Sequence, residues 1–178
     1  MKAELITPCE AYLESYLQAC IEYKENAVRT YSLHDPDAFD QWKEIIFQRF
    51  EKDRLGVDLR EGHVPSTTLW LVEDGAYIGT GNIRHKLTDS LSRFGGHIGY
   101  AIRFGMWGKG YGTLQLKLLL VHAAELGIER ALITCDETNV GSARVIEKCG
   151  GVYQDTIGNV VEGVHHDTKR YWIDTKHA

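Results

Sequence analysis

Four glycines, Gly105, Gly108, Gly110 and Gly112, fall within the stretch RFGMWGKGYGT. An alternating apolar run precedes this stretch and a leucine-rich run follows it, so we expect it to join a strand to a helix. Glycine has no Cβ, so such a turn leaves backbone N–H groups at the start of the helix unpaired and accessible. Because the helix dipole is positive at this end, the pattern predicts a phosphate-binding turn.

Spacing separates this prediction from two other glycine-rich motifs. A Walker loop needs Gly-Lys-Ser or Gly-Lys-Thr at the start of the helix, whereas Lys109 is followed by Gly110 and Tyr111. A dinucleotide-binding G-x-G-x-x-G motif needs glycine where this chain has Thr113. A flexible loop with a glycine at the helix start stays open as the third interpretation.

Two amphipathic helices are expected in the N-terminal third of the chain. The first begins near Pro8 and has apolar residues at intervals of three to four positions, namely Leu13, Leu17, Cys20 and Ile21. The second begins with Asp35 as cap and Pro36 as first helical residue, and runs to about Arg54.

The central part of the chain alternates with a period of two. Two strands around Asp74-Gly75 are expected to form a tight hairpin, because these residues tolerate positive φ. A third strand is expected over Gly96 to Phe104, and a buried strand over the run ERALITCD. The last expected hairpin turns at Gly158-Asn159, and its second strand ends in Tyr171, Trp172 and Ile173.

Two helices are expected in the C-terminal half. The first follows the glycine-rich turn and stops at Gly127, with an inner face expected to comprise Leu114, Leu118, Val121 and Leu126. The second covers NVGSARVIEKCGG and ends at Gly150 and Gly151. Together these elements predict an α+β (mixed α/β) fold in one domain over residues 1–178.

Composition excludes several classes of protein. The formal net charge of -5 and the scattered lysines and arginines do not provide the basic surface that binds nucleic acid. No segment has the apolar core of a signal peptide or the length of a membrane span, so we expect a cytoplasmic protein with no membrane partner. The four cysteines have neither disulfide-type nor zinc-type spacing, so free, mostly packed thiols and no metal are expected.

The run GKGYG at the start of a leucine-rich helix, followed downstream by TNVGSARVIEKCGG, resembles the GNAT superfamily of acyl-CoA-dependent N-acetyltransferases. The resemblance extends from about Trp70 to Tyr153 and implies a central, mostly antiparallel sheet of about seven strands flanked by about four helices. The family signature is Arg or Gln, two residues, Gly, one residue, then Gly or Ala. Gly110 and Gly112 fill the last two positions, and Trp107 stands where the family has Arg or Gln.

By this resemblance, the pyrophosphate of acetyl-CoA binds the amides from Gly108 to Thr113, with the Thr113 hydroxyl as an added donor. Lys109 either attracts the phosphates or is a solvated loop residue. The strand before the turn lies beside the pantetheine arm, and Asn139 and Ser142 either cap the following helix or contact the cofactor. The predicted cofactor-binding residues are Ala101, Ile102, Arg103, Gly108, Lys109, Gly110, Tyr111, Gly112, Thr113, Asn139 and Ser142.

Acetyl transfer to an amine needs a base, an oxyanion donor and a proton for the leaving thiolate. The resemblance nominates His97 as the catalytic base, and the backbone N–H of Ile102 or Arg103 as the oxyanion donor. Many family members have a tyrosine acid where this chain has Ile146, so water or Tyr153 is expected to protonate the thiolate. Other candidate groups are His85, Asp136, His165 and His166, and a structural role for His97 also stays open.

The resulting hypothesis is an N-acetyltransferase that moves an acetyl group from acetyl-CoA directly to a primary amine in a ternary complex. The amine belongs to a small molecule or a peptide. The alternatives are a catalytically silent acyl-CoA-binding sensor, indicated by Trp107 and Ile146, and a protein N-terminal or lysine acetyltransferase. The oligomeric state, including a homodimer, is open.

Overall fold

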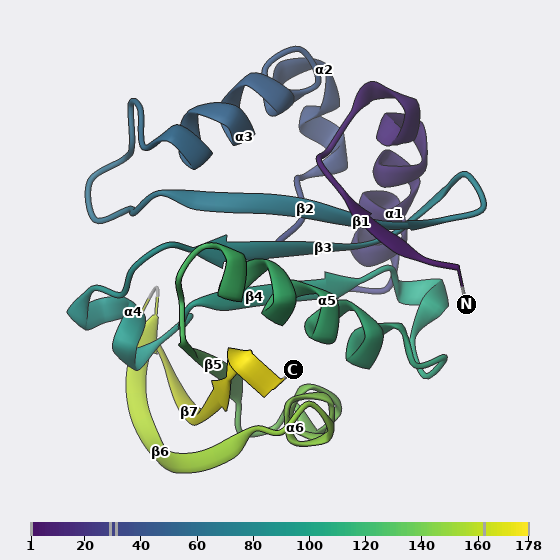
Figure 1. Ribbon diagram of the computed structural model, residues 1–178. Helices are drawn as coiled ribbons and strands as arrows, with labels where there is room; N and C mark the ends of the chain where they lie inside the picture. The colour runs from purple at the N-terminus through teal and green to yellow at the C-terminus, as the bar shows by residue number, and fades with distance from the viewer. Residues whose placement is uncertain (1, 29, 31, 162, 178) are drawn as a thin grey trace.

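The computed structural model describes residues 2–28, 30, 32–161 and 163–177, and contains two antiparallel sheets (Figure 1). The first sheet has the order β1-β2-β3-β4, with β1 Glu4–Ile6, β2 Ser66–Glu73, β3 Ala76–Arg84 and β4 Ile98–Ile102. The second has the order β5-β7-β6, with β5 Arg130–Asp136, β6 Val152–Val161 and β7 Val164–Asp174. The seven expected strands therefore form two sheets, and the expected fold class is confirmed.

Helices cover both faces of the first sheet. The α-helices of the described residues are α1 Leu13–Glu25, α2 Phe39–Trp42, α3 Ile46–Leu55, α4 Asp89–Arg93, α5 Tyr111–Glu125 and α6 Val140–Lys148. In Figure 1, α1, α2 and α3 lie on one side of this sheet, whereas α5 lies on the other side, facing the second sheet. A cluster of aromatic and aliphatic side chains fills the space under α1 to α3, and a larger aliphatic cluster surrounds α5.

The number of helical segments differs from the expectation because one helix breaks and another was missed. Asp35 does cap its segment, accepting the Asp37 N–H at 3.1 Å, but the predicted second helix is interrupted between α2 and α3. The short helix α4 begins after Thr88, whose hydroxyl accepts the Leu91 N–H. Pro8 precedes α1 and a short 3₁₀ turn, so it does not open the helix itself.

The inner face of α5 was predicted wrongly. Its buried apolar residues are Leu116, Leu119, Leu120 and Ala123, whereas Val121 and Leu126 are 45% and 44% exposed. The run LQLKLLLV places leucines on more than one side of the helix, so the apolar pattern leaves its rotation undetermined. Contacts with both sheets fix the rotation.

One of the two expected hairpins is confirmed and the other is shifted. Asp74 and Gly75 join β2 to β3 with φ angles of 49° and 77°, as predicted. Gly158 and Asn159 lie inside β6, opposite Asp167 and His166, so the terminal hairpin does not turn there. The turn follows Val161, where Gly163 supplies the positive φ of 78° that Gly158 does not adopt.

The two sheets meet where β4 begins beside β5. The backbone N–H of His97 donates to the Leu132 carbonyl at 2.7 Å. Gly96, with φ 61°, allows the backbone before β4 to approach β5 closely. A Cβ on Gly96 would lie 2.4 Å from the Leu132 carbonyl oxygen. No ladder continues this contact along the described residues of β4 and β5, so each strand is free to follow its own sheet.

The cysteine prediction is confirmed. All four cysteines are free, with Cys20, Cys135 and Cys149 buried and Cys9 exposed. In the described part of the chain, no helix combines the length and the hydropathy that crossing a bilayer requires.

Candidate functional site

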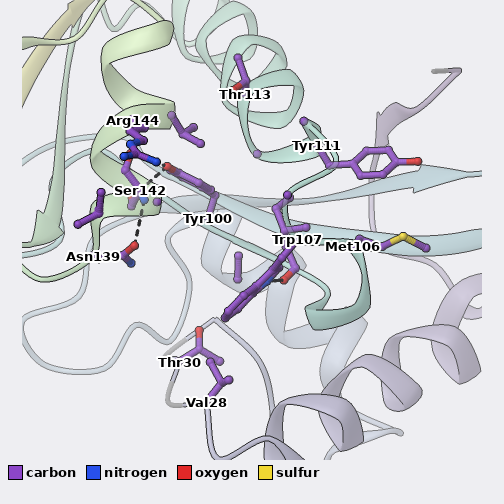
Figure 2. A pocket seen from close by; sticks show the side chains of 18 of the residues that line it. Val28, Thr30, Tyr100, Met106, Trp107, Tyr111, Thr113, Asn139, Ser142 and Arg144 are labelled. Atoms are coloured by element: carbon purple, nitrogen blue, oxygen red, sulfur yellow. Dashed lines mark hydrogen bonds between the residues drawn. The ribbon is translucent and has the colours of Figure 1, made fainter.

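A cleft of about 750 Å³ lies beside β4, between the N-terminal ends of α5 and α6 (Figure 2). The end of β4 and the glycine-rich turn form one wall, and the first turns of α5 and α6 form another. Tyr23 from α1, together with Val28 and Thr30 after it, contributes to the lining. The cleft therefore joins segments from both halves of the chain.

The N-terminus of α5 opens into this cleft without a side-chain cap. Gly110 is the N-cap residue with φ 89°, and Gly108 before it has φ 74°. The first hydrogen bond of the helix runs from the Leu114 N–H to the Gly110 carbonyl, at 3.2 Å. The N–H groups of residues 111–113 precede it and have no acceptor in the described chain. Three amides at a helix N-terminus thus face the cleft, as an anion requires.

The N-terminus of α6 differs because it is capped from within. The Asn139 side-chain oxygen accepts the Ser142 N–H at 2.9 Å, so the capping interpretation of Asn139 holds. Both residues also line the cleft. Arg144 and Lys148, one turn apart on α6, add positive charge to the lining. This pair was not among the residues predicted from sequence, although its i, i+4 spacing places both side chains on one face of the helix.

The edge of β4 facing the cleft carries the backbone groups of alternate residues. The Arg103 N–H donates to Ile78 of β3 at 2.8 Å, so it is not free to act as an oxyanion donor. By the alternation of an antiparallel ladder, Tyr100 and Ile102 direct their backbone groups to the opposite edge. Of the two expected oxyanion donors, only the Ile102 N–H lies on this edge.

Trp107, the departure from the family signature, anchors the glycine-rich turn. Its indole N–H donates to the Ile102 carbonyl at 2.6 Å, and the Tyr23 hydroxyl donates to the same oxygen at 2.6 Å. The Trp107 and Tyr23 rings meet edge to face at 6.1 Å. Figure 2 shows the half-exposed Trp107 ring extending toward Val28 and Thr30. The tryptophan thus provides an apolar wall in place of a charged or amide side chain.

The structure brings most of the predicted cofactor residues together. Those that line the cleft are Ala101, Ile102, Gly108, Gly110, Tyr111, Gly112, Thr113, Asn139 and Ser142. Arg103 and Lys109 are not among the lining residues. The Arg103 guanidinium instead pairs with Glu22 at 2.6 Å, and Lys109 Nζ donates to the Gly105 carbonyl at 2.8 Å.

The structure does not bring His97 to the cleft. Its Nδ1 accepts the Leu132 N–H at 2.9 Å, so the ring helps to join the two sheets. Burial, and secondarily the positive charge of Arg84, lower the pKa of His97 below its ordinary value. This contact corresponds to the structural role that the sequence left open for His97.

The other groups considered from sequence also lie outside the lining. The predicted alternatives are His85, Asp136, His165, His166 and Tyr153. His85 contacts Thr67, and His166 contacts Asp136 at 3.1 Å. No described cluster of three or more His, Cys, Asp or Glu side chains is arranged to hold a metal ion.

Tyr100 lines the cleft but was not among the residues predicted from sequence. Its hydroxyl lies 3.0 Å from the Ser142 Oγ, and Figure 2 shows this contact between β4 and α6. Burial raises the pKa of Tyr100, so the phenol is protonated at neutral pH. The strand GYAIR was predicted, but only the structure shows that this tyrosine lines the cleft and reaches Ser142 of α6.

Comparison with known families decides what kind of protein contains this cleft. Residues 4–152 match the acetyltransferase (GNAT) domain. The chain belongs to the GNAT family. The match covers β1 through the start of β6 and therefore includes the whole glycine-rich turn and α6.

Solved structures of other acetyltransferases share this GNAT fold. Mycobacterium smegmatis RimJ, in complex with CoA-disulfide, is 15% identical with a TM-score of 0.75, covering 98% of this chain and 83% of that one. The microcin C7 self-immunity acetyltransferase MccE, in complex with acetyl-CoA and AMP, is 18% identical with a TM-score of 0.71, covering 97% and 92%. RimL, a ribosomal L7/L12 alpha-N-protein acetyltransferase in complex with coenzyme A, is 19% identical with a TM-score of 0.68, covering 97% and 93%.

These likenesses establish the fold of the GNAT chain. No curated protein matches its sequence. The acceptor must therefore be inferred from the residues of this chain.

Proposed function

We propose that this GNAT protein transfers the acetyl group of acetyl-CoA directly to a primary amine in a ternary complex. The observation that supports the proposal best is the uncapped N-terminus of α5, whose free amides open into a cleft that continues along β4 to Tyr100 and Ser142. This arrangement suits a long ligand with phosphates at one end and a reactive group at the other. The complexes of MccE and RimL with acetyl-CoA or coenzyme A support the same assignment.

The cofactor would lie between α5 and α6. The amides from Gly108 to Thr113 would hold its pyrophosphate, with Arg144 and Lys148 adding attraction. The pantetheine arm would follow the free edge of β4, where Tyr100 and Ile102 present backbone groups. We place the thioester oxygen near the Ile102 N–H, which would stabilise the developing oxyanion.

The amine must lose its proton before it attacks. The cleft lining contains no carboxylate and no imidazole among the residues that the structure describes. We infer that water removes the proton and that the neutral fraction of the amine reacts.

The pH dependence of kcat/KM tests this inference. For an acceptor with an α-amine of pKa about 8, the rate should rise about tenfold per pH unit from pH 6 to about 7.5 and level off above pH 8. Burial lowers the pKa of His97 below its ordinary value, so catalysis with His97 as the base would give a profile that becomes flat well below the pKa of the amine. A flat profile, lost in His97→Asn, would contradict the inference and restore His97 as the base.

Tyr100 is proposed to stabilise the leaving thiolate. Its raised pKa prevents full proton transfer to a thiolate of pKa about 8.5, so the phenol acts as a hydrogen-bond donor and water supplies the final proton. Tyr100→Phe should lower kcat by about tenfold and change the Kd of coenzyme A by less than about threefold. Stopped-flow thiol detection and calorimetry measure the two quantities.

A matched variant separates this role from a general effect of removing a phenol. Tyr153→Phe removes a hydroxyl that contacts Thr156 on the exposed surface of β6, outside the cleft, and should leave kcat unchanged. An unchanged kcat in Tyr100→Phe would remove the tyrosine from the mechanism.

The proposed function is tested by incubating the protein with isotopically labelled acetyl-CoA and a panel of amines, then identifying products by mass spectrometry. The panel should include amino acids, polyamines and peptides with free N-termini, because RimL is an alpha-N-protein acetyltransferase. We expect transfer to at least one class. Tight binding of acetyl-CoA without transfer to any amine would favour the sensor alternative.

A further inference from the structure

Arg84, the last residue of β3, is a half-buried cation without an acidic partner in the described chain. Arg103 and Arg170, which are also largely buried, each bind a carboxylate, from Glu22 and Asp155 respectively. Burial lowers the pKa of the Arg84 guanidinium, and no described acid offsets this effect. A buried arginine is normally paired with an anion, and no described residue supplies one to Arg84. This leaves an anion-binding position open at the guanidinium.

The geometry of the guanidinium leaves one edge available. Nη1 donates to the carbonyls of Gly95 and Gly96, at 2.9 and 3.2 Å. Nε and Nη2 donate to none of the described residues. A Cβ on Gly99 would lie 3.7 Å from Nη1 and 3.8 Å from Nη2, so the group rests against β4 where there is no side chain. The Nε–Nη2 edge is the one that pairs with both oxygens of a carboxylate.

Arg84 lies on the face of the first sheet that is turned away from α5. On β3 the side chains alternate, and Gly81 and Ile83 face α5, as the contact of Gly81 with Leu119 shows. Arg84 and Asn82 therefore share the opposite face. Asn82 Nδ2 donates there to hydroxyls of β2, those of Ser66 at 3.2 Å and Thr68 at 3.0 Å.

These residues form a polar strip across the three strands. We define the polar strip as Ser66, Thr68, Asn82, Arg84 and Gly99, all half-buried. Gly99 and Ala101 lie on the same face of β4, and Ala101 lines the cleft. Two residues of a strand span about 7 Å, so the polar strip begins about that far from the cleft wall.

We propose that Arg84 binds a carboxylate of the amine acceptor through its Nε–Nη2 edge. The acceptors would then be amino acids or short peptides in which a carboxylate lies within about 7 Å of the reacting amine. This inference rests on the proposed function, because it requires the amine to reach the cleft beside Ala101. Between the guanidinium and the cleft, β4 carries only the small residues Gly99 and Ala101 on this face, and a Cβ on Gly99 would meet only the Arg84 guanidinium within 4 Å.

Paired acceptors measure the preference directly. The pairs are glutamate against glutamine amide, in which both carboxylates are replaced by amides, and the amidated peptides Ala-Glu-Ala against Ala-Gln-Ala, with phosphoethanolamine as a phosphate-bearing amine. We expect kcat/KM to be about 10- to 100-fold higher for the acidic member of at least one pair. Arg84→Gln should abolish the preference by slowing the acidic member alone, and Arg84→Lys should retain part of it. Equal rates within both pairs, or faster transfer to phosphoethanolamine, would overturn the assignment to a carboxylate.

A second pair of variants keeps Arg84 and therefore does not depend on how Arg84→Gln folds. Gly99→Asp places a carboxylate against the guanidinium, and Gly99→Asn places an isosteric neutral amide there. The Asp variant should lose the preference for acidic acceptors, whereas the Asn variant should keep it. Equal preference in both variants would contradict the proposal.

Product binding separates this inference from the proposed function. Calorimetry of N-acetylglutamate and N-acetylglutamine amide, which has no carboxylate, with the coenzyme A complex requires no turnover. Stronger binding of N-acetylglutamate that is lost in Arg84→Gln would support the carboxylate site even if no amine were acetylated. Acetyl transfer with equal binding of the two products would support the proposed function and overturn the role of Arg84.

Discussion

Gly108→Asp is expected to weaken the binding of coenzyme A by about 10- to 100-fold. Gly108 lines the cleft just before α5, and a Cβ there would meet no atom within 4 Å, so the new side chain fits. A carboxylate within roughly 6 Å of a bound phosphate costs about 2 to 3 kcal/mol per pair of charges at an effective dielectric constant near 20, before salt screening. Calorimetry at two salt concentrations measures the loss and its electrostatic share.

Gly108→Asn is the matched control. Gly108 has φ 74°, a conformation that Asn and Asp tolerate best among residues other than glycine, so the two variants incur similar backbone costs. The Asn variant should bind coenzyme A within about threefold of the original protein. Equal losses in the two variants would show that charge at this turn is unimportant and would contradict the proposed pyrophosphate position.

The glycine-rich turn could be predicted from sequence because its function depends on the backbone. Gly110 and Gly112 fill fixed positions of a motif, and the helix that follows them is strongly apolar. The consequence of Trp107 could not be predicted in this way. Its indole N–H binds the carbonyl of Ile102, and Tyr23, from α1, binds the same oxygen. Such a contact depends on how α1 packs against β4, which no local pattern encodes.

The choice of reactive residues was less predictable than the cofactor turn. His97 directly precedes β4 and Tyr100 lies within it, three positions later. The sequence offers no reason to choose the tyrosine over the histidine as a reactive residue. The structure separates them: His97 lies where β4 touches β5, whereas Tyr100 lies where the strands have parted. The point of divergence is set by long-range contacts, above all by the approach at Gly96.

Gly96→Ala is expected to lower the free energy of unfolding by about 3 kcal/mol or more. The positive φ of 61° costs an alanine about 1 kcal/mol, and its Cβ would lie 2.4 Å from the Leu132 carbonyl oxygen, a backbone atom that cannot rotate away. Relief requires β4 and β5 to separate where the hydrogen bonds between His97 and Leu132 join them. Thermal unfolding should show a midpoint about 10 °C lower.

Gly127→Ala isolates the steric share of that loss. Gly127 ends α5 with φ 81°, but a Cβ there would meet no atom within 4 Å, so only the backbone cost of about 1 kcal/mol applies. The midpoint of this variant should fall by about 3 °C. Equal shifts in the two variants would mean that the sheets can move apart at Gly96 without penalty. β4 and β5 could then separate at little cost in free energy. In that case the packing of α5 and α6 would have to fix the width of the cleft beside Tyr100.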